Sequence, residues 1–311
     1  MKETIPLFKV FMSPTAKDKA GEVLDSGYIG QGAKVDEFEK QIGDYFGNNK
    51  VVTTNAGTSA LHLALHLLKK PKPHWNEDVF QGVAFVSHNW PGIEDGDEVL
   101  ATPLTCTASN WPIVANNMKI KWVDIDPTTL NMDLEDLERK MTPKTKAIMG
   151  VHWGGYPLDL DKIRDIRGRF RGKHGWAPAL IEDGAHAFGS KYKGKYLGNH
   201  GNFVMNSLQA IKHITSVDGG LLYCPHDELY ERAKLLRWYG IDRNPKGRTD
   251  FRCEADIEEW GFKFHMNDVC AAIGIENFKH MDRLVSRHKE NAAYYDLRLQ
   301  NVEGVTLLKR E

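Results

Sequence analysis

Three short segments carry residue types that can bind a phosphate, a cationic ring nitrogen and a carbonyl carbon. The first is Asn55–Ser59, expected at the junction of a strand and a helix. Gly57 lets the backbone approach a ligand, and Thr58 and Ser59 offer hydroxyls at a helix N-terminus, where free N–H groups and the helix dipole favour a phosphate. A simple N-cap by Thr58 or Ser59 is the alternative interpretation.

The second segment is Ile181–Ala187, in which Asp183 follows an apolar run typical of a buried strand. Open α/β sheets bind ligands at the carboxyl ends of their strands. A carboxylate at that position needs a cationic partner, and a protonated pyridine nitrogen is one such partner. The alternative is that Asp183 caps the next helix.

The third segment, Ser207–His213, follows another expected strand end and precedes Gly219 and Gly220. Lys212 has apolar neighbours, which favour the uncharged amine that forms a Schiff base with a carbonyl carbon. Ser207 can hydrogen-bond a phosphate oxygen. A surface lysine in a loop explains the same residues without any ligand.

Strands and helices alternate along most of the chain, which predicts an α/β fold with a mostly parallel, doubly wound sheet. The link between the last two strands shows no helical pattern, so the final strand is expected to run antiparallel. The expected strands are Val51–Thr54, Val99–Thr102, Ile120–Ile125, Ala147–Val151, Ala179–Glu182, Phe203–Asn206 and Gly220–Cys224. The expected helices are Ser59–Leu68, Leu134–Met141, Leu160–Phe170, Glu228–Trp238, Val269–Asn277 and Leu284–Leu299.

The chain is expected to form a large domain over residues 1–245, with an N-terminal arm and an aromatic-rich surface excursion at 71–97. Residues 246–311 are expected to form part of a smaller C-terminal α+β domain. Its last element, an expected strand at Val305–Leu308, has no successor to pair with, so this domain looks incomplete.

Composition bears on the class of protein. The 311 residues carry a formal net charge of −1 without a long Lys/Arg run, which argues against a nucleic-acid partner. Neither a signal-type stretch nor a long apolar run is present, and the four cysteines are unclustered. The expectation is therefore a cytoplasmic protein with reduced thiols and no membrane span. His62 and His66 lie in an apolar helix and are interpreted as packed histidines, so no metal site is predicted.

Taken in order, the three segments resemble the DegT/StrS family of pyridoxal-phosphate-dependent sugar aminotransferases, which have the fold of aspartate aminotransferase. The resemblance runs from about Tyr28 to Asp282. Further matching blocks are Ser26–Gly32, Asn55–Leu61, Gly96–Val99, Val123–Asp126, Thr142–Ile148 and Met266–Gly274.

The resemblance implies a role for each residue of the three segments. Lys212 would hold pyridoxal phosphate as a Schiff base and shuttle a proton, Asp183 would pair with the pyridine nitrogen, and His186 would lie against the ring or its phenolic oxygen. Tyr28 and Gly30 would shape the substrate entrance. The residues implied for the cofactor phosphate are Gly57, Thr58, Ser59 and Ser207.

The sequence departs from the family pattern at two positions. Cys106 stands where many members place a Trp or Phe that stacks on the cofactor ring. Lys263 stands where some members place an Asn that reaches the phosphate of the partner subunit, so the resemblance implies a homodimer with shared active sites, in which Lys263 acts as a point charge. Family chains also usually continue past residue 311.

The implied activity moves an amino group from glutamate to a keto group of a nucleotide-linked sugar. One alternative is a sugar dehydratase that uses the same cofactor; in the related dehydratases a histidine replaces the lysine, so Lys212 favours transamination although His213 is beside it. Another is a catalytically silent protein with a regulatory or binding role. Arg237 and Arg243 could bind the donor carboxylate, but surface ion pairs are the preferred interpretation.

Overall fold

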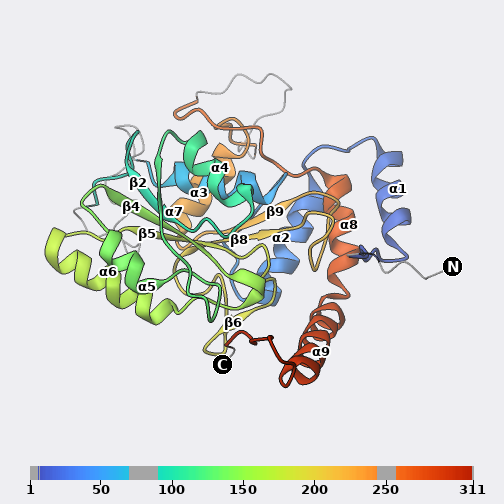
Figure 1. Cartoon of the computed structure of the whole chain (residues 1–311). Helices are drawn as coiled ribbons and strands as arrows, with labels where there is room; N and C mark the ends of the chain where they lie inside the picture. The colour runs from blue at the N-terminus through green and yellow to red at the C-terminus, as the bar shows by residue number, and fades with distance from the viewer. Residues whose placement is uncertain (1–5, 7, 70–89, 244–256, 310–311) are drawn as a thin grey trace.

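A seven-stranded sheet forms the centre of the computed structural model, which describes residues 6, 8–69, 90–243 and 257–309 (Figure 1). The strand order is β1-β9-β8-β5-β4-β2-β3, and all seven predicted strands are present. Their bounds are β1 Val51–Thr54, β2 Glu98–Ala101, β3 Lys119–Trp122, β4 Thr145–Val151, β5 Ala179–Asp183, β8 Phe203–Ser207 and β9 Gly220–Tyr223. A separate small hairpin pairs β6 (Lys191–Tyr192) with β7 (Lys195–Tyr196).

Strand direction places the ends that carry the predicted site residues together. Strand β9 is antiparallel to both of its neighbours, β1 and β8, and the remaining neighbours pair in parallel. The predicted antiparallel strand is thus confirmed. It follows that β1, β2, β4, β5 and β8 all end at one edge of the sheet, and that β9 begins there.

Helices cover both faces of the sheet, because successive strand residues point to opposite sides. Leu222 packs with the first of two core clusters and Leu221 with the second. Helices α3, α4 and α7 contribute to the first cluster; α2, α5 and α8 contribute to the second, and α6 supplies most of its buried side chains there too. Their bounds are α2 Ala33–Phe46, α3 Gly57–Leu67, α4 Thr107–Ala115, α5 Leu134–Lys140, α6 Leu160–His174, α7 Asp227–Leu236 and α8 Asp268–Phe278.

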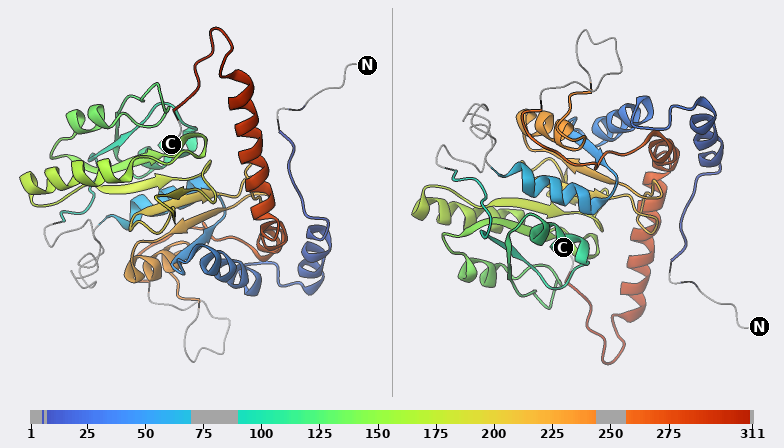
Figure 2. Two further views of the ribbon diagram at one scale, coloured as in Figure 1. Left: turned by 90° about the horizontal axis from the view of Figure 1, so that it is seen from below. Right: turned by 90° about the horizontal axis from the view of Figure 1, so that it is seen from above.

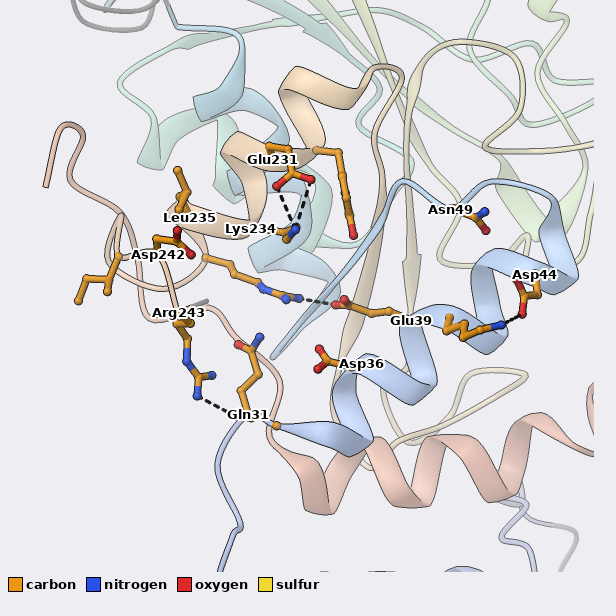
Figure 3. Close-up of a pocket in the computed structure, with 15 residues that line it drawn as sticks. Gln31, Asp36, Glu39, Asp44, Asn49, Glu231, Lys234, Leu235, Asp242 and Arg243 are labelled. Atoms are coloured by element: carbon orange, nitrogen blue, oxygen red, sulfur yellow. Dashed lines mark hydrogen bonds and ion pairs between the residues drawn. The ribbon is translucent and has the colours of Figure 1, made fainter. Parts of the chain in front are cut away.

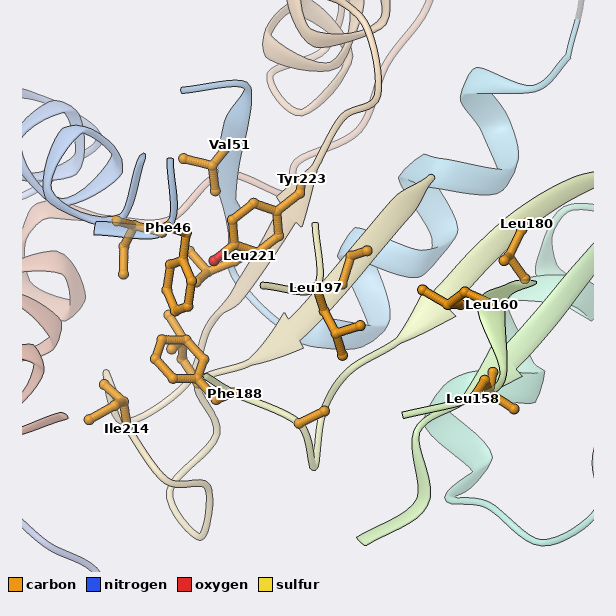
Figure 4. Close-up of a cluster of buried hydrophobic side chains, with 14 of the residues drawn as sticks. Phe46, Val51, Leu158, Leu160, Leu180, Phe188, Leu197, Ile214, Leu221 and Tyr223 are labelled. Carbon is orange, nitrogen blue, oxygen red and sulfur yellow. The ribbon is translucent and has the colours of Figure 1, made fainter. Parts of the chain in front are cut away.

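Aromatic side chains fill part of the second cluster (Figure 4). The ring of Phe46 meets those of Phe188 and Tyr223 edge to face, with centroids 5.4 and 5.9 Å apart. Such contacts add about 0.5–1.5 kcal/mol each beyond the burial of apolar area. They connect the end of α2 to the turn after β5 and to β9, and so they stabilise the packing on this face of the sheet.

Two helices lie at the side of the sheet. Helix α1 (Ala16–Ser26) packs on α8, and α9 (Met281–Leu299) stands apart from α6 and buries only Met281 (Figure 2). The sequence predicted α8 and α9 but not α1, α2 or α4. Asp268, the first residue of α8, accepts hydrogen bonds from the backbone N–H groups of Gly32 and Val35 at 2.8 and 3.1 Å. It thereby caps α2 from a distant part of the sequence.

Some expectations fail or fall outside the described residues. The expected strand Val305–Leu308 is wrong: this segment is irregular, and since no strand lies beside it, nothing pairs with its backbone as a ladder. The described part of 246–311 contributes the helices α8 and α9. The domain boundary at 245 and most of the 71–97 excursion lie outside the described residues. Trp90, at the end of the excursion, is buried against Trp176 with ring centroids 5.4 Å apart. None of the described helices is long and apolar enough to span a membrane.

Candidate active site

The predicted site residues meet at the edge where the parallel strands end. Asn55–Ser59 follow β1, Cys106 lies beyond β2, Asp183 ends β5, and Lys212 lies in the loop between β8 and β9. Ser207 at the end of β8 pairs with Gly220 of β9, which also pairs with Thr54 of β1. The sheet register alone therefore brings two segments to neighbouring positions: Asn55–Ser59, called here the phosphate turn after its predicted role, and the loop between β8 and β9 that carries Lys212, called here the lysine loop.

The phosphate turn leaves the first turn of α3 without a side-chain cap. The helix begins at Gly57, its N-cap residue is Ala56, and no side chain caps it, so the interpretation of Thr58 or Ser59 as an N-cap is wrong. A Cβ atom on Gly57 would lie 3.2 Å from Cβ of Ser207 and 2.9 Å from the sulfur of Met205. The close approach that only glycine allows here places the start of α3 directly against Ser207.

Asp183 is a buried carboxylate whose two oxygens each accept a hydrogen bond. Its Oδ1 accepts from the backbone N–H of Ala185 at 2.9 Å, and its Oδ2 accepts from the hydroxyl of Ser109 at 2.6 Å. A turn rather than a helix follows, so Asp183 does not cap a helix. None of the ion pairs between described residues includes this carboxylate, although only 3% of Asp183 is exposed. A buried carboxylate of this kind suits a cationic ligand group.

His186 is affected by the charges of both Asp183 and Lys212. Burial lowers the pKa of His186, the positive charge of Lys212 lowers it further, and Asp183 opposes both. Lys212 is half-buried, and the indole of Trp153 meets the His186 imidazole edge to face at 5.3 Å between centroids. The structure thus brings the three predicted catalytic side chains together, with Trp153 behind the imidazole.

The other predicted residues lie around this centre. Cys106 is exposed and immediately precedes α4, and Tyr28 is 85% exposed. The Gly30 carbonyl accepts from the backbone N–H of Asp268 at 2.8 Å, so the segment predicted to form the substrate entrance is anchored to α8. The Lys263 side chain is exposed, and its carbonyl accepts from the Asn55 amide at 3.3 Å. Lys263 thus lies beside the phosphate turn of its own chain.

A buried network that sequence reasoning missed supports the loop after β4. His152 and Glu182 are both fully buried, with Nε2 and Oε2 2.9 Å apart. The backbone N–H of Leu158 donates to His152 Nδ1 at 3.0 Å, so the imidazole proton lies on Nε2 and is donated to Glu182. His152 also donates its backbone N–H to the Asp183 carbonyl at 3.0 Å. The spacing of His152 and Glu182 along the sequence does not indicate that they pair.

A polar groove of about 740 Å³ lies between α2 and α7, and neither Lys212 nor Asp183 lines it (Figure 3). Its wall includes Arg237, which pairs with Glu39 and donates to the Thr53 carbonyl at 3.0 Å. Arg237 is 3% exposed, so the predicted ion pair exists but is buried rather than on the surface. Arg243 donates to the Gln31 carbonyl at 2.8 Å. These contacts hold the walls of the groove together, so its polar side chains stabilise the fold beside the segment around Gly30.

Histidines of α3 pack as expected. His66 is buried and its Nε2 lies 3.1 Å from Glu259 Oε1, while His62 meets the rings of Phe262 and Phe264 edge to face. Within the described ranges, no three His, Cys, Asp or Glu side chains are arranged to hold a metal ion.

The residues at the strand ends fit pyridoxal phosphate. An uncapped helix start beside Ser207 suits the phosphate. The buried Asp183 suits a protonated ring nitrogen, and the half-buried Lys212 is an amine within the electrostatic reach of His186.

Comparisons with known proteins agree with this geometry. The family model described as the DegT/DnrJ/EryC1/StrS aminotransferase family matches residues 12–74 and 82–311. The spore coat polysaccharide biosynthesis protein SpsC of Bacillus subtilis is 32% identical over 91% of this chain and 66% of its own length. The UDP-4-amino-4-deoxy-L-arabinose–oxoglutarate aminotransferase of Shewanella sediminis is 30% identical over 98% and 72%. The chain thus spans about two thirds of these relatives.

Solved structures give the same result. AtS13 from Actinomadura melliaura is 49% identical with a TM-score of 0.88, over 100% of this chain and 76% of that one. The sugar aminotransferase CalS13 from Micromonospora echinospora is 42% identical with a TM-score of 0.87, over 99% and 77%. An E. coli GDP-4-keto-6-deoxy-D-mannose-3-dehydratase with bound hydrated pyridoxal phosphate is 26% identical with a TM-score of 0.81, over 96% and 73%.

Proposed function

The chain belongs to the DegT/DnrJ/EryC1/StrS aminotransferase family, and we propose that it moves an amino group from glutamate to a keto group of a nucleotide-linked sugar. It is a pyridoxal-phosphate-dependent transaminase of the sugar aminotransferase type, as the sequence predicted. The nucleotide, the sugar and the donor are the proposal. The name of the Shewanella sediminis relative supports the proposal, because it contains a UDP-linked amino sugar and oxoglutarate, the keto acid that glutamate becomes when it gives up its amino group.

The observation that carries the proposal is the convergence of Asp183, His186 and Lys212 beside the uncapped start of α3. When bound, pyridoxal phosphate supplies an electron sink for the carbon that loses or gains a proton. The Lys212 amine would hold the cofactor and move that proton. Asp183 would keep the ring nitrogen protonated, and His186, whose imidazole meets the Trp153 indole edge to face, would lie against the ring.

We assign the phosphate to the first turn of α3, where Gly57, Thr58 and Ser59 present backbone N–H groups and hydroxyls, and to the hydroxyl of Ser207. The exposed side chain of Tyr28 and the anchored Gly30 segment form the sugar entrance. Lys263 supplies a positive charge near the phosphate, in a homodimer with shared active sites. A cytoplasmic location stays a prediction; the free thiols of Cys106 and Cys224 fit it.

A dehydratase is the second candidate, because a pyridoxal-phosphate dehydratase is among the structural relatives. Lys212 argues against it, since a lysine can both hold the cofactor and return the proton. One incubation separates the two. A dehydratase releases water from the nucleotide sugar and leaves no amino group on it, whereas an aminotransferase leaves an amino sugar and oxoglutarate.

Purified protein reconstituted with pyridoxal phosphate tests the proposal. We expect visible absorbance that bleaches on addition of glutamate and returns when a suitable nucleotide keto-sugar is added. A panel of UDP-, GDP- and dTDP-linked keto-sugars, followed by mass spectrometry for the amino sugar, identifies the acceptor. Colour that glutamate leaves unchanged, with every other amino acid also inert, would show that the chain is a binding or regulatory member of the family.

A further inference from the structure

The carboxylate of Asp183 ends a short chain of side-chain hydroxyls. Ser109 Oγ lies 2.6 Å from Asp183 Oδ2, and Thr105 Oγ1 lies 2.6 Å from Ser109 Oγ. An ionised carboxylate only accepts hydrogen bonds, so Ser109 must give its single proton to Asp183. Thr105 is then the donor to Ser109. Both bonds therefore run in one direction, from Thr105 through Ser109 to Asp183.

This chain of hydroxyls fixes the orientation of the carboxylate. Ser109 is 1% exposed and Asp183 is 3% exposed, so water does not replace a lost donor easily. Since Oδ1 is bonded to the backbone N–H of Ala185, the carboxyl plane cannot turn without breaking one of two hydrogen bonds. Consecutive hydrogen bonds also polarise one another in a buried site. Thr105 consequently strengthens the bond that Ser109 makes.

We propose that Ser109 is a positioning residue for the partner of the cofactor ring nitrogen, with Thr105 as its support. The inference rests on the proposed function, because it takes Asp183 to meet that nitrogen. Ser109 lies in the first turn of α4, and Thr105 lies one residue before Cys106. The segment that the family resemblance places over the face of the ring thus also orients the group at the edge of the ring.

A double-mutant cycle on cofactor binding tests whether Ser109 acts through Asp183. Apoproteins of the wild type, Ser109→Ala, Asp183→Ala and the double variant are titrated with pyridoxal phosphate, and dissociation constants are read from absorbance. Ser109→Ala should weaken binding about tenfold, as expected for a hydrogen bond to a charged group. In the Asp183→Ala chain the same change should have no further effect. The same loss in both backgrounds, or no loss in either, overturns the proposal.

A second pair of variants keeps the test independent of folding at the buried position. Thr105 is half-buried, and Thr105→Val removes its hydroxyl while Thr105→Ser keeps it. The Val variant should bind the cofactor about threefold more weakly, since it removes only a supporting bond, and the Ser variant should bind normally. If the Val and Ser variants bind the cofactor equally well, the proposed role of Thr105 is overturned, because its hydrogen bond to Ser109 then does not affect binding.

Thr142→Val is the matched control. The Thr142 hydroxyl donates to a carboxylate oxygen of Glu98 at 2.7 Å, at the opposite edge of the sheet, so this variant loses a similar bond away from the site. It should bind the cofactor as the wild type does. If the wild type itself binds no pyridoxal phosphate, the proposed function fails. If the wild type binds and Ser109→Ala behaves like Thr142→Val, only the present inference fails.

Discussion

Both carboxylate oxygens of Glu259 accept hydrogen bonds from Arg232, at 2.8 Å from Nε and 2.7 Å from Nη2. Arg232 is fully buried in α7 and also donates to the Leu67 carbonyl at 2.7 Å. His66 Nε2 of α3 lies 3.1 Å from Oε1 of the same carboxylate. This arrangement joins the ends of α3 and α7 to the segment that carries Lys263, so the position of Lys263 depends on a buried ion pair.

Glu259→Gln should destabilise the protein by about 3 kcal/mol, because it leaves the Arg232 charge buried without its partner. The free energy of unfolding in urea measures the effect. Glu231→Gln is the control: Glu231 is in an exposed ion pair with Lys234, and its loss should change stability by about 0–1 kcal/mol. Equal effects of the two variants would mean that the buried pair does not stabilise the fold.

The same pair should make stability depend on acid. Burial favours a raised pKa for Glu259, but hydrogen bonds from Arg232 and His66 outweigh it and lower the pKa to about 2 from 4.5. A lowered pKa means that the contribution is complete above pH 4.5 and is lost as the pH falls from there towards 2. The difference in unfolding free energy between the wild type and Glu259→Gln should shrink over that window and stay constant from pH 5 to 7.

Lys212→Ala should abolish the visible absorbance of the bound cofactor while the fold survives, because it removes the amine that we assign to the Schiff base. Spectra after extensive dialysis, with circular dichroism as the check on folding, measure this. Lys119→Ala is a matched lysine control that should keep the absorbance, because Lys119 is exposed at the start of β3, away from the edge where the parallel strands end. Unchanged colour in Lys212→Ala would refute the assignment of the lysine.

Asp183→Asn should leave some cofactor bound but slow the half-reaction with glutamate by orders of magnitude. A neutral amide does not keep the ring nitrogen protonated, so the electron sink is weaker. Stopped-flow absorbance after mixing with glutamate gives the rate. A normal rate would reduce Asp183 to a structural role in the turn before Ala185.

Replacing Cys106 with Trp or Phe restores the usual aromatic of the family. Cys106 is exposed, so there is space for a larger side chain on that side of the site. We expect tighter cofactor retention by about 1 kcal/mol from the new ring contact. Dissociation rates after dilution measure it. Looser retention with an intact fold would mean that another group, such as His186, already covers that face of the ring.

A mixture of two inactive variants tests the shared active site. Lys212→Ala removes the Schiff base in one chain, and Lys263→Glu repels phosphate in the site of its neighbour. In a freely exchanging dimer, activity should recover to about a quarter of wild type, because half of the dimers are mixed and each has one intact site. No recovery, with mixed dimers shown to form, would assign Lys263 to its own chain, where its carbonyl already meets Asn55.

The sequence predicted the sheet well because buried parallel strands are continuous apolar runs such as those around Ile148 and Ile181. It singled out three segments that meet at one edge of the sheet, because each combines turn residues with a chemically useful side chain; their roles in the site stay predictions. It missed Ser109 and Glu182, since their partners lie far away in sequence and only the fold brings them together. The expected strand at Val305–Leu308 failed because apolar alternation alone does not supply a neighbouring strand to pair with.

The single antiparallel strand also bears on how this protein tolerates change. The loops after β2 and β4 lead into helices and do not return at once to the sheet, so an insertion there lengthens a connection rather than a strand pairing. The lysine loop returns at once to the sheet, and Leu208 bonds to Gly219 at 2.9 Å and to Ser216 at 3.0 Å across its base. Loops that contact the sugar can therefore differ in length between relatives while the Lys212 amine keeps its position. The same transamination chemistry can then be used with many sugar acceptors.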